Sequence, residues 1–344
     1  MRGQSRHQHY NDTTAPVTSA APAVNGVPTV DAPQLLNWPK DANAGLPDLT
    51  EETANRLSDL HGQFSEDCDL VLSTAGNYHM ALKEFWYDVF LPNYAPELKN
   101  WYYTTSPPVA LDQIKNVNVT FGNLSLKCIP QAAVGPQATI QQLQSAGLTE
   151  GSSIPLFKNR GNVILVKKGN PKHIASVWDL ARPDVRVITP HPTLEKDTFV
   201  NYSNTIFDVA LNDEPNVPRG WTAERLFNSI FNNDVVKDKW LIGARIHHRE
   251  SPWSVAYGRA DATVIFYHLA LDAVRSFPDL FEIVPIGGTA DNPQPLPGNR
   301  LGPHFVIRIK GNWTPDQLDA REKLINAFGS SEFTGILERH GMTR

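Results

Sequence analysis

The sequence predicts a mixed α/β protein with parallel sheets, and three observations support that fold class. Short apolar runs are repeatedly followed by a small-residue turn and then by a stretch of helical spacing, the pattern of parallel strands covered by helices. Of the 344 residues, 41% are hydrophobic and 19% charged, which supports a buried core and excludes collagen-like and coiled-coil chains. No unit of about thirty residues recurs, so doubly wound sheets are expected in place of a solenoid.

Residues 1–48 predict a flexible or extended tail. They are rich in Pro, Ala, Thr, Asn and Gly and carry too little apolar surface to offset the entropy of ordering. No apolar segment follows the early arginines, so Met1 does not begin an ordinary secretory signal. Two interpretations fit: an export signal was removed, or the protein is intracellular.

The elements expected in the first half begin with a helical pattern from Thr50 to Phe64. Apolar runs then predict strands, and near-helical spacing predicts helices between them. The expected strands are 69–74, 101–104 and 124–129, and the expected helices are 80–90, 109–114 and 140–146.

The second half repeats the same alternation. Continuous apolar runs again predict buried strands, each broken by Gly, Pro or Asn. The expected strands are 162–166, 185–189, 242–246, 262–267, 281–286 and 305–309, and the expected helices are 199–211, 223–232, 268–276 and 315–328.

Charge, cysteine content and motifs exclude several function classes. The 31 basic against 36 acidic residues give a net charge of −5, so a nucleic-acid footprint is not expected. No apolar run approaches the roughly 18 residues that cross a bilayer. Nucleophile-elbow, phosphate-loop, dinucleotide and zinc-helix motifs are all missing from the sequence, so an enzyme is not expected. Cys68 and Cys128 could form one disulfide bond, and the sequence does not decide whether they do.

Polar and small residues stand where predicted strands give way to helices. The cases are residues 76–79 (GNYH), 105–106 (TS) and 190–193 (PHPT). Ligands of open α/β sheets bind at the carboxyl ends of strands, where helix N-termini present free N–H groups that suit an anion. Each segment could also serve only as a turn or helix cap.

Taken in order, several segments resemble the periplasmic molybdate/tungstate-binding proteins of ABC transporters. The resemblance extends over about residues 68–344. Its segments are LVLSTAGNY (70–78), TTSPP with LDQI (104–114), LQSAGL (143–148), NRGNVILVKKGNP (159–171), DLARPDVRV (179–187), GRADA with VIFY (258–267) and SEF through ILERHG (331–341).

The resemblance implies a type II periplasmic-binding-protein fold, with two doubly wound α/β lobes joined by a hinge and an N-terminal extension. Lobe one would comprise residues 49–158 and 270–344, and lobe two residues 159–269, with the chain crossing near Arg160 and Tyr267. A small oxyanion such as molybdate or tungstate would bind in an interlobe cleft, without a cofactor, for delivery to an ABC-transporter membrane subunit. The protein would be periplasmic or extracellular, or cytoplasmic if Met1 is its native start.

The ligand contacts that the resemblance implies lie on the turns described above and on lobe two. They are Gly76, Asn77, Tyr78, Thr105, Ser106, His191, His248 and Tyr267. At Asn77 the family has a serine, so the sequence predicts a side-chain amide as the donor in place of a hydroxyl.

The histidines leave a second interpretation open. His79, His191, His247, His248 and Glu250 could bind a transition metal or a metal chelate, because imidazole and carboxylate are suitable ligands. Adjacent His247 and His248 would point in opposite directions on a strand, which disfavours a shared metal. An intracellular anion-binding or storage protein is a further alternative.

Overall fold

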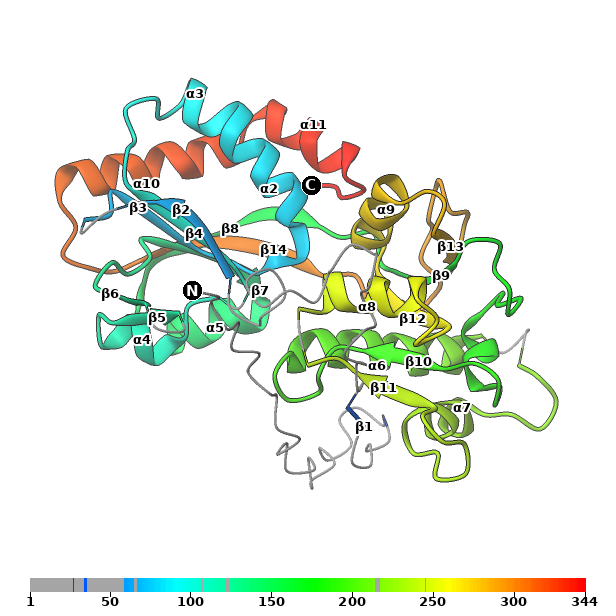
Figure 1. The fold of residues 1–344 in the computed structure, drawn as a ribbon. Helices are drawn as coiled ribbons and strands as arrows, with labels where there is room; N and C mark the ends of the chain where they lie inside the picture. Colours follow the sequence, from blue (N-terminus) through cyan, green and yellow to red (C-terminus); the bar gives the residue numbers. More distant parts are fainter. Residues whose placement is uncertain are drawn as a thin grey trace, which may run out of the picture.

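The computed structural model describes Val27 and residues 34–35, 59–64, 67–106, 108–121, 124–213, 217–244 and 246–344. Two six-stranded sheets form two lobes that lie side by side (Figure 1). Helices pack on both sheets, so the prediction of an α/β protein with two lobes is confirmed. None of the described helices combines the length and apolar character needed to cross a bilayer.

Lobe one is built on the sheet with strand order β2-β4-β3-β7-β14-β8. Parallel pairing joins β3 to β4 and β7, and the remaining neighbours are antiparallel. The strands are β2 (Asp59–Gln63), β3 (Leu70–Ser73), β4 (Trp101–Ser106), β7 (Ala132–Pro136), β8 (Thr149–Lys158) and β14 (Pro303–Ile309), with a separate hairpin of β5 (Val119–Phe121) and β6 (Leu124–Leu126).

Helices cover both faces of this sheet (Figure 1). One core cluster lies under α2, α10 and α11, and another lies between the opposite face and α4 and α5. The elements are η1 (Gly76–Tyr78), α2 (His79–Phe85), η2 (Trp86–Phe90), α3 (Leu91–Asn93), α4 (Leu111–Lys115), α5 (Gln137–Ser145), α10 (Pro315–Phe328) and α11 (Ser331–Arg339).

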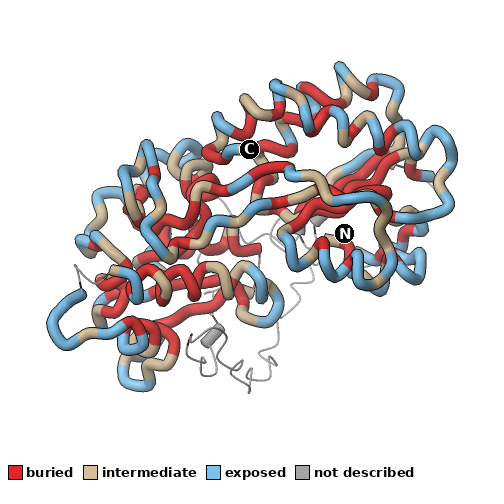
Figure 2. The backbone as a smooth tube through the Cα atoms, turned by 180° about the vertical axis from the view of Figure 1, so that it is seen from behind, coloured by how far each residue is buried: buried red, intermediate tan, exposed pale blue. Residues whose placement is uncertain are grey.

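Lobe two is built on the sheet with strand order β1-β11-β10-β12-β9-β13. Its strands are β1 (Gln34–Leu35), β9 (Asn162–Lys167), β10 (Val187–Thr189), β11 (Trp240–Ile242), β12 (Ala262–Phe266) and β13 (Phe281–Pro285). Its helices are η3 (Val177–Ala181), α6 (Lys196–Asn212), α7 (Ala223–Phe231), α8 (His247–Ala256) and α9 (Tyr267–Ser276). Buried residues follow the strands inside each lobe, and exposed residues lie on the outer helices and turns (Figure 2).

The return from lobe two to lobe one differs from the prediction, which assigned residues 270–344 to lobe one. Strand β13 pairs with β9 of lobe two, and the next strand, β14, pairs with β7 and β8 of lobe one. The chain therefore returns between residues 286 and 302, and not near Tyr267. An apolar run shows that a strand exists but not which sheet it joins, because that depends on partners distant in sequence.

Three local predictions were also wrong. Residues 59–63 form strand β2 on the edge of the lobe-one sheet, whereas a helical pattern was expected there. The third strand expected in lobe one, 124–129, contains only the short hairpin strand β6. The strand that joins the sheet after β4 is β7, whose small residues AAVGP give no clear apolar run. The expected strand 242–246 is replaced by β11, and α8 begins at His247.

The expected tail is described only at three positions. Val27 is buried in the core of lobe two, and β1 pairs in parallel with β11 at the edge of the same sheet. The rest of residues 1–58 lies outside the described residues.

A disulfide joins Cys68 and Cys128, a pairing that the sequence allows but does not require. Cys68 precedes β3, and Cys128 follows β6. The bond therefore ties the hairpin to the start of β3 across a sequence separation of 60 residues.

We expect the Cys68→Ala/Cys128→Ala double variant to lose about 4 kcal/mol of unfolding free energy, because the cross-link restricts the unfolded chain. Chemical denaturation with and without reductant measures this loss, and the variant should not respond to reductant. Two free thiols in the denatured, unreduced wild type would contradict the bond.

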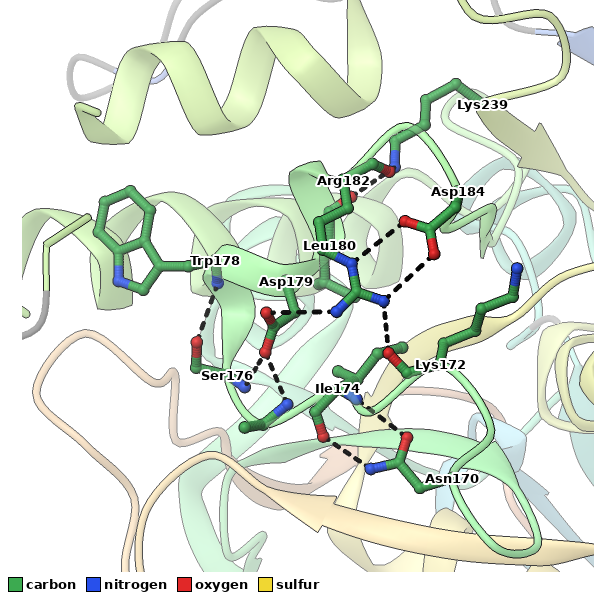
Figure 3. A network of polar contacts seen from close by, with 11 residues as sticks. Asn170, Lys172, Ile174, Ser176, Trp178, Asp179, Leu180, Arg182, Asp184 and Lys239 are labelled. Carbon is green, nitrogen blue, oxygen red and sulfur yellow. Dashed lines mark hydrogen bonds and ion pairs between the residues drawn. The ribbon is translucent and has the colours of Figure 1, made fainter. Parts of the chain in front are cut away.

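A buried lysine fixes the start of β11. The Lys239 ammonium donates to the carbonyl oxygens of Leu180 and Arg182, each at 2.6 Å, and to that of Val185. Burial lowers the pKa of Lys239 to about 8. Around this contact, the Arg182 guanidinium binds the Asp184 and Asp179 carboxylates (Figure 3). The network connects η3, β10 and β11 through polar groups inside lobe two.

Lys239→Met should lower the unfolding free energy by about 3 kcal/mol, because three buried carbonyls lose their donor. Urea denaturation measures the change. The exposed Lys237 provides the matched control, and Lys237→Met should change stability by less than about 0.5 kcal/mol. Equal stability of the two variants would refute the structural role of Lys239.

Candidate functional site

Three helices of lobe two begin without a side-chain cap. The residues before α6, α8 and α9 are Glu195, Ile246 and Phe266, and none accepts a capping hydrogen bond through its side chain. By contrast, Thr222, Thr314 and Ser330 cap α7, α10 and α11. The first N–H groups of α8 and α9 thus carry partial positive charge that no side chain of the cap residue neutralises.

The starts of α8 and α9 lie against η1 of lobe one. The imidazoles of His79 on α2 and His248 on α8 stack with ring centroids 4.7 Å apart. Gly76 permits this approach, because an added Cβ would lie 2.1 Å from the Thr105 carbonyl oxygen and 3.0 Å from His248 Cε1. A side chain at position 76 would therefore clash with Thr105 of the same lobe and would crowd His248 of lobe two.

Asn77 binds a histidine that the sequence did not single out. Its Nδ2 lies 3.0 Å from His304 Nε2, and His304 Nδ1 lies 3.3 Å from the Gly302 carbonyl oxygen. The His304 ring also stacks on Phe157 with centroids 4.5 Å apart. Asn77 Oδ1 is buried and has no hydrogen-bond partner among the described residues.

His268, the second residue of α9, is the most deeply buried imidazole of the junction, at 1% exposure. Among the described residues neither ring nitrogen makes a hydrogen bond of good geometry, and the Asn77 backbone is the polar group that interacts with the ring. Burial lowers the pKa of His268 to about 3, although the Asn77 backbone lies near enough to raise it, and the His304, His79 and His247 rings also lower it. The neutral ring therefore retains one donor and one acceptor.

His247 is bound on both sides by groups of α6. Its Nδ1 lies 3.0 Å from Glu195 Oε1, and its Nε2 lies 3.1 Å from the Tyr202 hydroxyl. The other carboxylate oxygen, Glu195 Oε2, is buried and without a partner among the described residues. This arrangement fixes the His247 ring and leaves a second acceptor beside the start of α8.

Several residues predicted for the site have structural roles instead. The Tyr78 hydroxyl lies 2.7 Å from Thr74 Oγ1, and its ring packs on Phe157 in the core of lobe one. His191 Nδ1 accepts from the backbone N–H groups of Thr193 and Leu194 at 3.0 and 3.1 Å. The His191 ring therefore stabilises the turn that leads into α6.

The remaining predicted residues lie near the junction. Tyr267 is the buried first residue of α9, with the Arg160 guanidinium 5.6 Å from its ring centroid. Burial raises the pKa of Tyr267. Thr105 is buried near the end of β4, and Ser106 is the last residue of that strand.

Asparagines hold the two segments where the chain changes lobes. Asn159 Oδ1 accepts from the N–H groups of Gly161 and Gly302, each at 3.1 Å. Asn299 accepts from the Asn162 N–H at 2.8 Å and donates to the Asn162 carbonyl at 2.9 Å. Because the chain passes between the lobes at these segments, a change of their backbone angles would move the lobes relative to each other.

The metal interpretation finds no ligand set in the part of the chain that the structure describes. No group of three or more His, Cys, Asp and Glu side chains there could hold a metal ion. His247 is occupied by Glu195 and Tyr202, and Glu250 is a fully buried residue of α8.

Prediction from the sequence did not single out His268, His304, Glu195 or Asn162 as site residues. His268 directly follows a predicted strand, which is a usable signal for a site residue. His304 opens a strand in the last quarter of the chain, and nothing in its neighbourhood indicates that it faces Asn77.

The comparisons with known proteins identify the family. Residues 132–343 match the family described as bacterial extracellular solute-binding protein, and the chain belongs to that family. The family binds solutes, in agreement with the prediction of a binding protein in place of an enzyme. No curated protein sequence is significantly similar to the chain.

Solved structures share the fold at low identity. The sulfate-binding protein SubI from Mycobacterium tuberculosis has a TM-score of 0.53 and 16% identity, covering 79% of this chain and 85% of SubI. PEB3 of Campylobacter jejuni with L-phospholactate has a TM-score of 0.51 and 16% identity, covering 80% of this chain and 99% of PEB3. The PBP AgtB from A. tumefaciens R10 with agropinic acid has a TM-score of 0.52 and 13% identity, covering 80% of this chain and 81% of AgtB.

The buried imidazoles predict a stability that falls with acid. Burial lowers the pKa of His268 to about 3 and of His304 to about 4, below the value of about 6.5 in the unfolded chain. The unfolded state therefore binds more protons as the pH falls below about 6.5, and stability falls with it.

Lowering the pH from about 7 to about 5 should reduce the unfolding free energy by roughly 2 kcal/mol for each of these two histidines. Urea denaturation at both pH values measures the loss, and His304→Phe should reduce it. An unfolding free energy that is equal or higher at the lower pH would contradict neutral, buried rings.

Proposed function

We propose that the chain is the solute-binding protein of an ABC transporter and captures a small anion between its two lobes. The family match supports solute binding. The anion is proposed from the junction, where uncapped starts of α8 and α9 meet polar groups of lobe one. Molybdate and tungstate are the anions that the sequence resemblance implies, and the proposal itself extends to small anions as a class.

His268 is the observation that carries the proposal. An imidazole at 1% exposure whose ring has only the Asn77 backbone within reach costs free energy, on the order of 1–3 kcal/mol for each unsatisfied group. A ligand that bonds to the ring would remove this cost. The position of His268 in the first turn of α9 favours a negatively charged ligand there.

The site proposed from these contacts spans both lobes. Lobe one supplies Gly76, Asn77 and Thr105, and lobe two supplies His248, Tyr267 and His268. These side chains are largely covered in the present arrangement, so the lobes would have to part at the asparagine-bound crossings to admit a ligand. Closure would then bury the ligand between them.

An extracytoplasmic location is also part of the proposal. The family is described as extracellular, and the Cys68–Cys128 disulfide is a bond that persists in oxidising compartments. The membrane component of a transporter would be the partner that receives the solute.

Thermal unfolding of dialysed protein in the presence of molybdate, tungstate, sulfate, phosphate, Zn²⁺ or Ni²⁺ tests the proposal. A ligand of the folded state adds about 2.7 kcal/mol of stability at a hundredfold excess over Kd. We expect at least one anion to give this rise and His268→Asn to abolish it.

His173→Asn is the matched control, because His173 is an exposed histidine of lobe two. It should keep the full response to the anion. A rise with a metal alone, or an anion response that survives in His268→Asn, would contradict capture at this junction.

A further inference from the structure

The unpartnered oxygen atoms of the junction carry information about the ligand. Asn77 Oδ1 on lobe one and Glu195 Oε2 on lobe two are both buried without a hydrogen-bond partner among the described residues. Both are acceptors, and neither can donate while the carboxyl is ionised. An oxyanion without protons would place its own lone pairs against them.

The orientation of the Asn77 amide follows from its neighbours. The Gly302 carbonyl can only accept, so the contact at 3.3 Å requires a proton on His304 Nδ1. In the neutral ring Nε2 is then an acceptor, and it receives the Asn77 Nδ2–H at 3.0 Å. Burial keeps the ring neutral, lowering the pKa of His304 to about 4.

Asn77 therefore does not offer its amide donor to a ligand, contrary to the expectation from the sequence. The NH₂ group is held by His304, and Oδ1 is the atom left over. The serine that the family carries at this turn could donate through its hydroxyl, whereas this carbonyl oxygen cannot.

We infer that the junction selects anions that carry a hydroxyl or other protonated oxygen, and discriminates against fully deprotonated oxyanions such as sulfate and molybdate. The ligand's hydroxyl donates to Asn77 Oδ1, and its anionic oxygen accepts from the His268 ring and the start of α9. This inference rests on the proposed function. His304 is a positioning residue, because it acts by fixing the Asn77 amide.

Isothermal titration with two matched pairs of probes tests the inference. Inorganic phosphate at about pH 8 keeps one P–OH, whereas sulfate has the same shape and charge without a proton. L-lactate differs from propionate by a hydroxyl. We expect the hydroxyl-bearing member of at least one pair to bind ten times more tightly or better.

If sulfate binds as tightly as phosphate and propionate binds as tightly as lactate, the inference is overturned and the proposed function stands. Binding of molybdate more tightly than phosphate would likewise overturn the inference and leave the proposed function standing. Failure of every anion to bind would overturn the proposed function, and the inference with it.

Three variants locate the discrimination. In Asn77→Ser the hydroxyl can donate, so the preference should fall toward equal affinity for phosphate and sulfate. His304→Phe keeps the stacking on Phe157 but frees the Asn77 amide to rotate, and should reduce the same ratio without preventing folding. Asn312→Ser, at an exposed asparagine after β14, should leave the ratio unchanged. An unchanged ratio in both Asn77→Ser and His304→Phe would contradict the role of Asn77 Oδ1.

Discussion

The first turns of α8 and α9 are the constraint on which the rest of the account depends. Each helix follows a strand end of lobe two and begins without a side-chain cap. The Tyr267 N–H of α9 donates to the Gly161 carbonyl oxygen at 3.0 Å, so it is the other N–H groups of each first turn that need a partner. The fold directs both starts toward η1 of lobe one, where the close approach of Gly76 to His248 brings the lobes together. The site that we propose between the lobes depends on that arrangement.

Burial then determines the chemistry of the junction. Removed from water, His268 and His304 favour their neutral forms, and a neutral histidine has a defined donor and a defined acceptor. This definition fixes the orientation of the Asn77 amide. Polar groups that would be adaptable in water become specific here, because each unsatisfied atom inside the protein costs free energy.

Much of the fold could be predicted from the sequence, because β9 and β12 are continuous apolar runs and most helices show apolar residues at helical spacing. Strands that the sequence did not predict include β2, β7 and β8. They are rich in small or polar residues, and they are positioned by pairing with strands distant in sequence. The candidate site was predicted only in outline. The strand-end rule finds Asn77, and the family resemblance adds Tyr267. The bond between Asn77 and His304 joins residues 227 positions apart, so no local pattern indicates it.

A crystal structure of the chain with the anion that most raises its thermal stability would test the central claim most directly. We predict that the anion lies between the lobes, with one oxygen bonded to a ring nitrogen of His268 and a hydroxyl on Asn77 Oδ1. An anion bound on the outer surface of either lobe, with His268 and Asn77 unchanged, would contradict the account.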